Sequence, residues 1–503
     1  MKRITLVLIL LSLWHAGSST EVFFNVLDYG AVNTGQALTT SAIQKAIDEC
    51  AGKGGGTVLF PAGKYISGTI FLKSFVTLHL ESGAVLAGST NLADYPVTIA
   101  GIRSYTDNYT CRSLIYAENQ ESISITGQGI LDGNGSSFQV SDELRRSSLF
   151  ESYKARPYMI RFIHCSDVQL RNITLKNSPM WVQHYLSCSN VVISGITVDS
   201  RVNRNNDGID IDACENVRIS DCEISSGDDA IVLKSTCGKL CKNVVITNCI
   251  LSSECNAFKL GTESNGGFEN ISFSNSVVYN TDLAGIAIEM VDGGTLSNVI
   301  VSGINMDSVG CALFVRLGNR ARPFLPGQAL PGTGQLSGLI ISAIQATNVG
   351  IEGCSFTGLP SFPVMNITLR DIRLAFAGGG TTEHAKAIIE ELPAKYPEFD
   401  MFGILPAYGL YFRHARGVTL DHVVLDYRTA DYRPAVYLND VDDASISGLK
   451  AESEKETESI FVVDNSRDVV MNECYRLKNN GLLLTLRNGS KNIIVKNSLK
   501  KKR

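Results

Sequence analysis

Proline, charge and long apolar runs are all scarce in this sequence. Its 503 residues include 13 prolines and 2 tryptophans, and charged residues make up 19% of the chain. This composition excludes a collagen-like or disordered chain, and the 44% of hydrophobic residues can bury a sizeable core. After the N-terminus, no apolar run approaches the roughly 20 residues that span a bilayer, so we expect no association with a membrane.

An excess of positive charge is also missing. The 45 lysines and arginines are outnumbered by 50 aspartates and glutamates, which gives a net charge of −5. Because nucleic-acid binding depends on a basic surface, a nucleic-acid partner is not expected. The 7 histidines and 13 cysteines show no zinc-ligand spacing, so the sequence predicts neither a metal site nor another cofactor. We expect the protein to be a monomer.

The first 18 residues have the features of an export signal. Two basic residues precede an apolar stretch at 4–14, and small residues follow at 16–18. The sequence therefore predicts a signal peptide at 1–18 and an exported protein, periplasmic or extracellular, with a single catalytic domain at 19–503. A membrane anchor is the less favoured alternative, because the apolar stretch is short.

The cysteines suggest packing rather than cross-linking. Most lie in apolar, strand-like surroundings, where a free cysteine packs as a small hydrophobic residue. Cys237 and Cys241 differ, since they lie close together in a loop-like stretch. A disulfide between them stays open, because pairing cannot be derived from sequence.

A short phrase recurs through the middle of the chain: an asparagine, a β-branched residue, any residue and an apolar residue. The clearest copies begin at Asn190, Asn216, Asn243, Asn270 and Asn298, at intervals of 26 to 28 residues. A fixed period of this length, with short strands separated by turn residues, is typical of a solenoid rather than of three domains. We predict an all-β chain folded as a right-handed parallel β-helix, with isoleucine, valine and leucine lining its interior.

Three segments depart from the repeat. Helical spacing of apolar residues over 40–51 predicts a short helix that caps the open N-terminal end of the solenoid. Segment 318–335 is rich in proline and glycine and is expected to form a loop. Segment 377–408 has helix-like apolar spacing and is expected to be an insertion, a candidate lid over the solenoid.

Apolar residues align successive turns around position 210. Ile209 and Ile211 align with Ile231 and Leu233 of the next turn, and then with the pairs at 258/260, 286/288 and 313/315. Because alternate strand residues point to opposite faces, the residues between them face outward, where we expect contact with solvent. The outward positions hold Asp210, Val232, Lys259, Ala287 and Phe314 in one column and Asp212, Lys234, Gly261, Glu289 and Arg316 in the next.

The same alignment places Asp207 and Asp229 in one column just before the strands begin, about one strand spacing apart. Asp228 is expected to point to another side of the same turn. Two close carboxylates can hold and deprotonate a water while a third protonates a leaving oxygen. Inverting glycosidases keep acid and base about 6.5–9.5 Å apart for that water. Close like charges also raise a carboxyl pKa, as an acid catalyst requires. The alternative is that these aspartates only form turns.

Around these aspartates the chain resembles glycoside hydrolase family 28, the polygalacturonase-like pectin hydrolases. LDGNG from Leu131, NSPMWVQH from Asn177, NNDGIDID from Asn205 and SGDDAIVLKS from Ser226 follow in the family's order. The resemblance implies a right-handed β-helix and hydrolysis with inversion, without a metal or organic cofactor. It implies that Asp228 is the general acid and that Asp207 and Asp229 activate the water.

Two further motifs of that family are altered. Cys255-Asn256-Ala257 replaces Gly-His-Gly, and Ala287-Ile288-Glu289 replaces the Arg-Ile-Lys that grips a uronate carboxylate. The alignment places Lys259 beside Ala287, and Lys234 and Arg316 in the column of Glu289. We expect Lys259 to bind the carboxylate of a uronate. The open alternative is a solvated ladder in which Glu289 pairs with Arg316.

The remaining candidate substrate contacts come from three motifs. They are Asn205 and Asp210 of NNDGIDID, Asn256 of the altered histidine motif, and Trp181 and His184 of NSPMWVQH. The ring of Trp181 offers a platform for the apolar face of a sugar. His184 matches a position often near the sugar in the family, and the alternative is a structural histidine.

These observations predict a secreted, inverting glycoside hydrolase that acts on pectic polysaccharides or oligosaccharides. Exo action on galacturonate-containing pectin is favoured, because the loops at 318–335 and 377–408 can block one end of a groove. The alternatives are a rhamnosidase or rhamnogalacturonan hydrolase, a polysaccharide lyase on the same fold, and a β-helix that binds glycan without catalysis.

Overall fold

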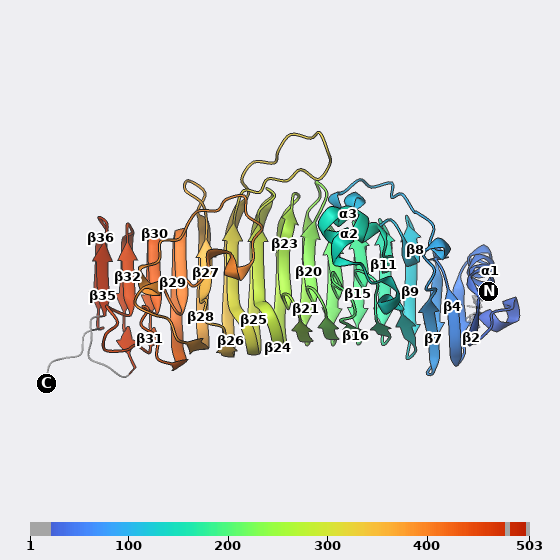
Figure 1. Cartoon of the computed structure of the whole chain (residues 1–503), viewed down its shortest axis with the longest axis horizontal. Helices are drawn as coiled ribbons and strands as arrows, with labels where there is room; N and C mark the ends of the chain where they lie inside the picture. The colour runs from blue at the N-terminus through green and yellow to red at the C-terminus, as the bar shows by residue number, and fades with distance from the viewer. Residues whose placement is uncertain (1–21, 478–482, 499–503) are drawn as a thin grey trace, which may run out of the picture.

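The computed structural model describes residues 22–477 and 483–498, and its main feature is a long solenoid of stacked strands (Figure 1). The predicted export signal lies outside the described residues. The first turns consist of β1 (Phe23–Asn25), β2 (Thr34–Leu38), β3 (Gly56–Phe60), β4 (Gly63–Ser67), β5 (Ile70–Phe71), β6 (Val76–Leu80), β7 (Ala84–Gly88), β8 (Ser113–Glu118), β9 (Glu121–Gly127), β10 (Ile130–Asp132), β11 (Tyr158–Ile163), β12 (Ser166–Arg171) and β13 (Thr174–Lys176).

The central turns carry the predicted site, and the C-terminal turns follow them. The central strands are β14 (Gln183–Leu186), β15 (Ser189–Ser194), β16 (Thr197–Ser200), β17 (Ile209–Asp212), β18 (Glu215–Ser220), β19 (Glu223–Ser226), β20 (Ile231–Ser235), β21 (Cys241–Thr247), β22 (Ile250–Ser253), β23 (Phe258–Ser264), β24 (Phe268–Met290) and β25 (Thr295–Leu317). The C-terminal strands are β26 (Gln335–Val349), β27 (Cys354–Thr357), β28 (Val364–Gly378), β29 (Leu410–Thr429), β30 (Val436–Ser447), β31 (Lys450–Ala451), β32 (Phe461–Asp464), β33 (Arg467–Asn472), β34 (Tyr475–Arg476), β35 (Leu484–Arg487) and β36 (Lys491–Lys496).

Through most of the solenoid each turn contributes three strands, and each strand pairs with the one three places further along. β11 pairs with β14, β14 with β17 and β17 with β20, all in parallel. Between β24 and β30 most strands are longer, and β24 and β25 each span 23 residues. This arrangement confirms the predicted right-handed parallel β-helix.

The predicted register of the interior is observed in the central turns. Ile209 pairs with Ile231, which pairs with Phe258, and Ile211 pairs with Leu233 in the same way. These side chains are fully buried. Alternation along the strands therefore fixes which side chains point inward, and the apolar ladders hold the turns in register.

The recurrent asparagine has a structural explanation. The five residues that open the clear copies of the phrase have φ between 54° and 60°, in the left-handed region that asparagine tolerates. Their side chains also bond to one another from turn to turn: Asn216 Nδ2 donates to Asn190 Oδ1 at 3.2 Å, and Asn243 Nδ2 donates to Asn216 Oδ1 at 3.0 Å. One residue type thus makes the corner and links successive turns.

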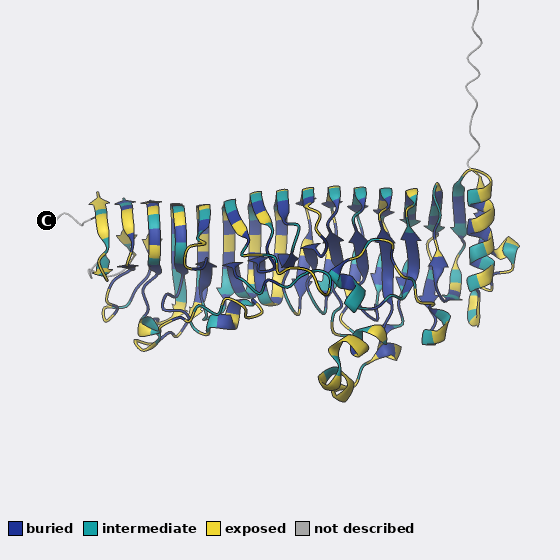
Figure 2. Ribbon diagram, turned by 90° about the horizontal axis from the view of Figure 1, so that it is seen from above, coloured by how far each residue is buried: buried dark blue, intermediate teal, exposed yellow. Residues whose placement is uncertain are grey.

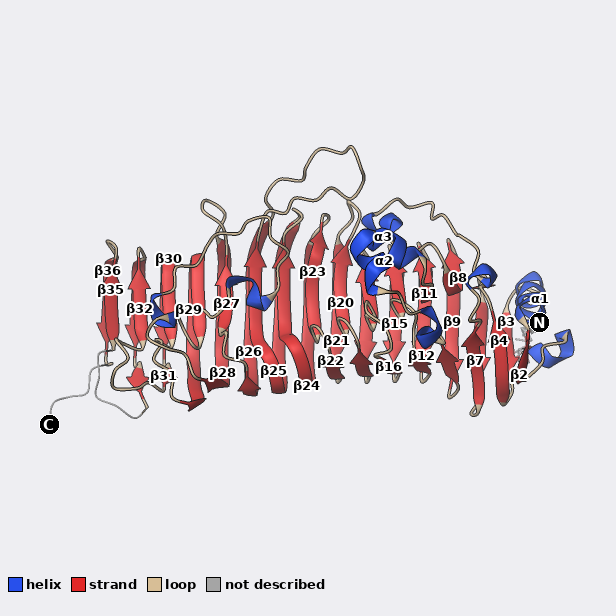
Figure 3. Ribbon diagram, viewed as in Figure 1, coloured by secondary structure: helices blue, strands red, loops and turns tan. Residues whose placement is uncertain are grey.

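The described helices are few and lie at one end and on one side of the strands (Figure 3). α1 (Thr40–Gly52) closes the N-terminal end, as predicted, with Ile43, Ala46, Ile47 and Cys50 buried against the first turn. α2 (Asp142–Ser147) and α3 (Leu149–Lys154) project from a long side of the solenoid (Figure 2). No helix within residues 22–477 and 483–498 is long and apolar enough to cross a membrane.

The two insertions lie between β25 and β26, at 318–334, and between β28 and β29, at 379–409. The helix-like spacing in the second was misleading, since it holds only two 3₁₀ turns, His384–Lys386 and Phe399–Phe402. The guanidinium of Arg413, a residue of β29, donates to the carbonyl oxygen of Ile389 at 2.5 Å. This oxygen therefore accepts a hydrogen bond from the solenoid, where a helix would use it as an acceptor for one of its own amides. The insertion is held by the solenoid rather than by its own helix.

All 13 cysteines are described, and all are free thiols. Cys237 and Cys241 are both buried and carry no disulfide between them. The expectation that cysteines pack as small apolar residues agrees with the burial of eleven of them.

Candidate active site

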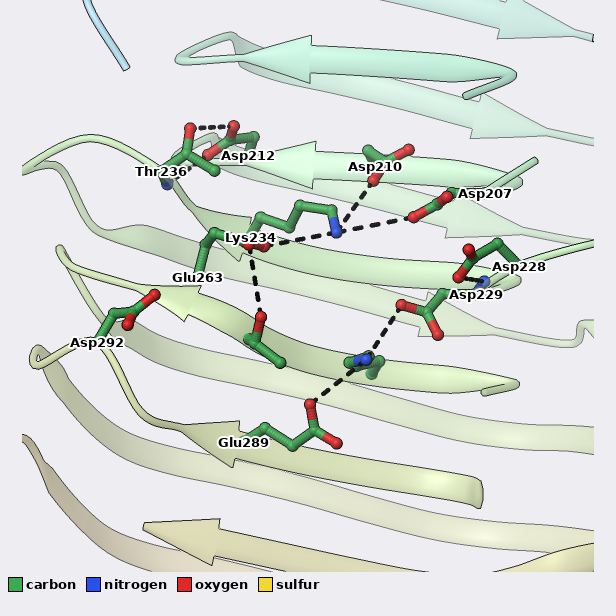
Figure 4. A network of polar contacts seen from close by, with 12 residues as sticks. Asp207, Asp210, Asp212, Asp228, Asp229, Lys234, Thr236, Glu263, Glu289 and Asp292 are labelled. Carbon is green, nitrogen blue, oxygen red and sulfur yellow. Dashed lines mark hydrogen bonds and ion pairs between the residues drawn. The ribbon is translucent and has the colours of Figure 1, made fainter. Parts of the chain in front are cut away.

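Three carboxylates meet where β17 and β20 begin. The amide of Gly208 donates to the carbonyl of Asp229 at 2.9 Å, which sets Asp207 beside Asp229 on the next turn, as the alignment predicted. The amide of Asp229 donates to Oδ1 of Asp228 at 2.9 Å. Figure 4 shows the side chains of all three aspartates gathered at this edge of the strands. Neighbouring turns therefore supply three carboxylates to one place.

These carboxylates line a cavity of about 230 Å³. Its wall contains Tyr105, Tyr109, Leu149, Phe150, Tyr153, Met180, Trp181, Asn205, Asp207, Asp228, Asp229, Lys234, Glu263, Arg322 and Tyr396. Ligand sites in proteins commonly measure about 300–1,000 Å³, so this cavity is small.

Asp228 and Asp229 differ in their electrostatics although they are adjacent in the chain. Burial raises the pKa of Asp228, and the negative charge of Asp229 raises it further. Burial acts on Asp229 as well, but the ammonium groups of Lys259 and Lys234 hold its pKa below the ordinary value. Asp228 is therefore suited to carry a proton and Asp229 to accept one.

Asp207 is the third carboxylate. Burial raises its pKa well above the ordinary value, and the charges of Asp228 and Asp210 act in the same direction. Lys234 opposes this shift, with its ammonium 3.7 Å from Asp207 and 3.6 Å from Asp210 (Figure 4). Of the three carboxylates, Asp229 is the one that its surroundings keep ionised.

Lys259 lies outside the cavity wall and lowers the pKa of Asp229. Its Nζ lies 3.4 Å from both Asp229 Oδ2 and Glu289 Oε2. It also lies 3.3 Å from Glu398 Oε1, which belongs to the 379–409 insertion. Asn256 donates through Nδ2 to Asp229 Oδ1 at 2.9 Å. Lys259 and Asn256 therefore orient Asp229, where the family pattern has a histidine at position 256.

The outward positions of the central strands do not face solvent, which corrects the sequence prediction. Asp210 and Glu289 are 0% exposed, Lys259 and Arg316 are 2% exposed, and Lys234 is 6% exposed. The strand period correctly gives their direction, but the 379–409 insertion contacts Lys259 and Arg316 from outside. The period says nothing about a segment that folds back from 75 or more residues away.

Burial also changes the role of most candidate substrate contacts. Asn205, Lys234 and Trp181 line the cavity, whereas Asp210, Asn256, Lys259, His184, Glu289 and Arg316 do not. The expected direct contact between Lys259 and a uronate is therefore wrong, because the ammonium of Lys259 already pairs with three carboxylates of the protein. These six residues are therefore buried outside the cavity wall and cannot contact a sugar held in it.

The alternative pairing of Glu289 with Arg316 is not formed, although the two residues are neighbours in register. Arg316 donates instead to the carbonyl oxygens of Glu391 at 2.6 Å and Leu392 at 3.3 Å. Glu289 faces Lys259. Arg316 thus anchors the 379–409 insertion. The sequence alone does not reveal this role, because it does not show where the insertion lies.

Trp181 and His184 lie in different surroundings and therefore have different roles. Trp181 lines the cavity, and Lys234 Nζ lies 4.8 Å from the centre of its ring. His184 is fully buried, with Nε2 3.1 Å from Asp212 Oδ2, and burial lowers the pKa of its imidazole. His184 is therefore a neutral side chain that supports Trp181, in line with the structural alternative.

Sequence reasoning missed most of the aromatic wall. Tyr109 packs edge-on against Tyr153 of α3 and against Trp181, with ring centres 4.9 Å and 5.2 Å apart. Arg322 of the first insertion lies over the Tyr105 ring at 3.5 Å. These rings come from irregular segments outside the repeat. The clustering of tyrosine and phenylalanine at 105–109 and 150–153 was the available signal.

One set among the described residues has the spacing of metal ligands. Single ligand atoms of Asp228, Asp229 and Cys255 lie within 4.8 Å of one another. Because the set contains the acid and base candidates, we interpret it as catalytic. The same distance places Asp228 and Asp229 closer together than the about 6.5–9.5 Å found in most inverting glycosidases, so the expected wide gap does not occur between these two.

The chain matches the family model for glycosyl hydrolases family 28 over residues 50–391. It belongs to this family. A probable polygalacturonase from Vitis vinifera is 32% identical over 377 residues, which cover 70% of this chain and 74% of that protein. The exo-poly-alpha-D-galacturonosidase of Dickeya chrysanthemi is 30% identical over 249 residues, 41% of each chain.

Solved structures show the same fold. The hyperthermoactive exopolygalacturonase from Thermotoga maritima superposes with a TM-score of 0.62 at 20% identity, covering 80% of this chain and 92% of that chain. The family 28 exopolygalacturonase from Yersinia enterocolitica gives a TM-score of 0.57 at 20% identity, covering 94% of this chain and 78% of that chain. The protein is a polygalacturonase-like glycoside hydrolase, and the pectin hydrolases are its class.

Proposed function

We propose that the protein is an exported, inverting hydrolase that releases sugars from the ends of galacturonate-containing pectin fragments. The observation that carries this proposal is the small cavity lined by Asp207, Asp228 and Asp229. Arg322 and Tyr396, from the two insertions, complete its wall. A wall closed by both insertions favours a chain end over a chain middle, and exo action is named in several of the similar proteins.

The mechanism follows from the electrostatics. Asp228, with its raised pKa, protonates the glycosidic oxygen as the bond to the anomeric carbon breaks. Asp229, kept ionised by Lys259 and Lys234, removes a proton from the attacking water. Asp207 stands beside Asp229 on the next turn and holds that water by a hydrogen bond. The resemblance to family 28 implies attack from the face opposite the leaving group, which inverts the anomeric configuration, although Asp228 and Asp229 lie closer together than is usual for inversion.

A neutral terminal sugar, as in a rhamnosidase or a rhamnogalacturonan hydrolase, is the second candidate. It is favoured by position 289, where Glu289 stands in place of the lysine of the family's uronate-gripping motif. Burial raises the pKa of Glu289 well above the ordinary value, so this position offers no positive charge to the carboxylate of a terminal uronate.

Product analysis by NMR on a panel of pectin fragments tests the proposal. α-Linked oligogalacturonides are expected to yield monogalacturonate, with the β anomer appearing first. Release of rhamnose from rhamnogalacturonan fragments alone would replace the proposal by the second candidate. An unsaturated uronate, read by its absorbance, would indicate a lyase, and binding without any product would indicate a non-catalytic β-helix.

A further inference from the structure

A second pocket adjoins the catalytic cavity. Asn205 lines both, and Gly227, which precedes Asp228 in the chain, lines the second. This pocket measures about 310 Å³, and its charged residues are Arg145, Arg156, Arg201, Arg204, Asp142 and Glu254. It therefore lies beside the general acid and carries more positive than negative charge.

Arg156 is the buried cation of this pocket, at 4% exposure. Its guanidinium donates to Asn205 Oδ1 at 3.0 Å. It also donates to the carbonyls of Arg204 at 2.5 Å, Ser152 at 3.2 Å and Pro179 at 3.5 Å, which leaves one N–H for a ligand. Within the described part of the chain, no carboxylate lies at ion-pair distance from it. Burying a cation without a counter-ion costs free energy, so a ligand carboxylate would supply what the protein lacks.

The other charges of the pocket balance one another except for Arg204. Arg145 pairs with Asp142 at 3.3 Å, and Arg201 pairs with Glu254 at 3.7 Å. Arg204 is exposed and makes no ion pair among residues 22–477 and 483–498. Arg156 and Arg204 both line the pocket, and the side chain of Arg156 donates to the backbone carbonyl of Arg204. The pocket therefore contains two guanidinium groups that no carboxylate of the described residues pairs with.

We propose that this pocket, which we call the arginine pocket, binds the carboxylate of an acidic sugar next to the sugar held in the catalytic cavity. Arginine suits this task, because its planar guanidinium matches a carboxylate with two parallel hydrogen bonds. The inference rests on the proposed function in one respect, that the substrate is a pectic chain containing uronates. It places the recognition of acidity on the sugar across the cleaved bond from the sugar in the catalytic cavity.

Kinetics of Arg204→Gln on oligogalacturonides of increasing length test this inference. Loss of one charge-assisted hydrogen bond is expected to lower kcat/KM about 10-fold on substrates long enough to reach the pocket. Carboxyl-reduced oligomers of the same length are expected to show no such loss. The matched control is Arg146→Gln, the next residue along from Arg145 on α2, which does not line the pocket and is expected to behave as wild type.

An equal loss on acidic and reduced oligomers, a loss in the Arg146→Gln control, or no loss in Arg204→Gln would overturn the arginine pocket. Calorimetric binding of oligogalacturonides separates this inference from the proposed function. If wild type binds them without cleaving them, the proposed reaction is wrong, and weaker binding by Arg204→Gln still supports the pocket. Equal binding by both proteins overturns it.

Discussion

The two faces of β17, β20 and β23 are built from alternate residues of the same short strands, yet they differ in kind. The inner face is an apolar ladder that includes Ile211 and Leu233, and it repeats from turn to turn. The outer face is a buried network of charges that includes Asp210 and Lys259, and nothing in it repeats. The comparison teaches that the strand period builds the scaffold, whereas covering segments from elsewhere convert its outer surface into a site.

The largest effect is expected at the general acid. Asp228→Asn keeps the shape of the side chain and the hydrogen bond from the Asp229 amide but cannot donate the proton. We expect kcat on the natural substrate to fall by about 10²–10⁴-fold, with substrate binding nearly unchanged. Steady-state kinetics and calorimetry measure both. Retention of more than about a tenth of the wild-type kcat would show that Asp228 is not the acid.

On the inner face the expected effect is on folding. Leu233→Ala removes a fully buried side chain from the ladder and is expected to lower the free energy of unfolding by about 2–5 kcal/mol. Denaturant unfolding measures this loss. Because Leu233 points away from the cavity, kcat of the folded protein should stay near wild type. A large fall in kcat would mean that the two faces are not independent.

Lys259 is expected to act through Asp229 rather than on substrate. Lys259→Met removes the cation that keeps the pKa of Asp229 low, so this pKa rises. The acidic limb of the pH–kcat/KM profile is then expected to move to higher pH. The half-buried Lys242, paired with Glu215 and outside the cavity, supplies the control variant Lys242→Met. An unshifted limb, with a loss confined to acidic substrates, would instead restore direct contact between Lys259 and a uronate.

The smallest expected effect is a gain in stability. Burial raises the pKa of Asp228 in the folded protein, so the folded state binds more protons and loses stability as pH rises from the unfolded value, about 3.9, through the raised one. Asp228→Asn removes this loss. We expect Tm at pH 7 to increase by about 1–2 °C and to match wild type below about pH 4. Scanning calorimetry at both pH values measures it, and a lower Tm at pH 7 would contradict the burial argument.

The parts of the molecule that could be predicted from the sequence are those with local or periodic causes. The β-helix, the capping helix and the register of Ile209, Ile231 and Phe258 follow from spacing alone. The adjacency of Asp207 and Asp229 follows from the same register. A strand with a period of two residues specifies these relations without reference to the rest of the chain.

The environment of the site could not be predicted, because it depends on contacts across long stretches of chain. Glu398 reaches Lys259 from 139 residues away, and Arg316 binds carbonyls 75 and 76 residues further along. Irregular segments such as 379–409 have no period that would fix their path. Spacing therefore places Lys259 in the correct column but does not show that carboxylates enclose it.

Rescue by an activated substrate tests the central claim, that the outer face divides acid and water-activating roles between its aspartates. An aryl α-galacturonide with a good leaving group needs no proton at the glycosidic oxygen. We predict that this substrate restores turnover to Asp228→Asn and leaves Asp229→Asn inactive, because Asp229 removes the proton from the water. Equal rescue of both variants, or rescue of Asp229→Asn alone, would contradict this division.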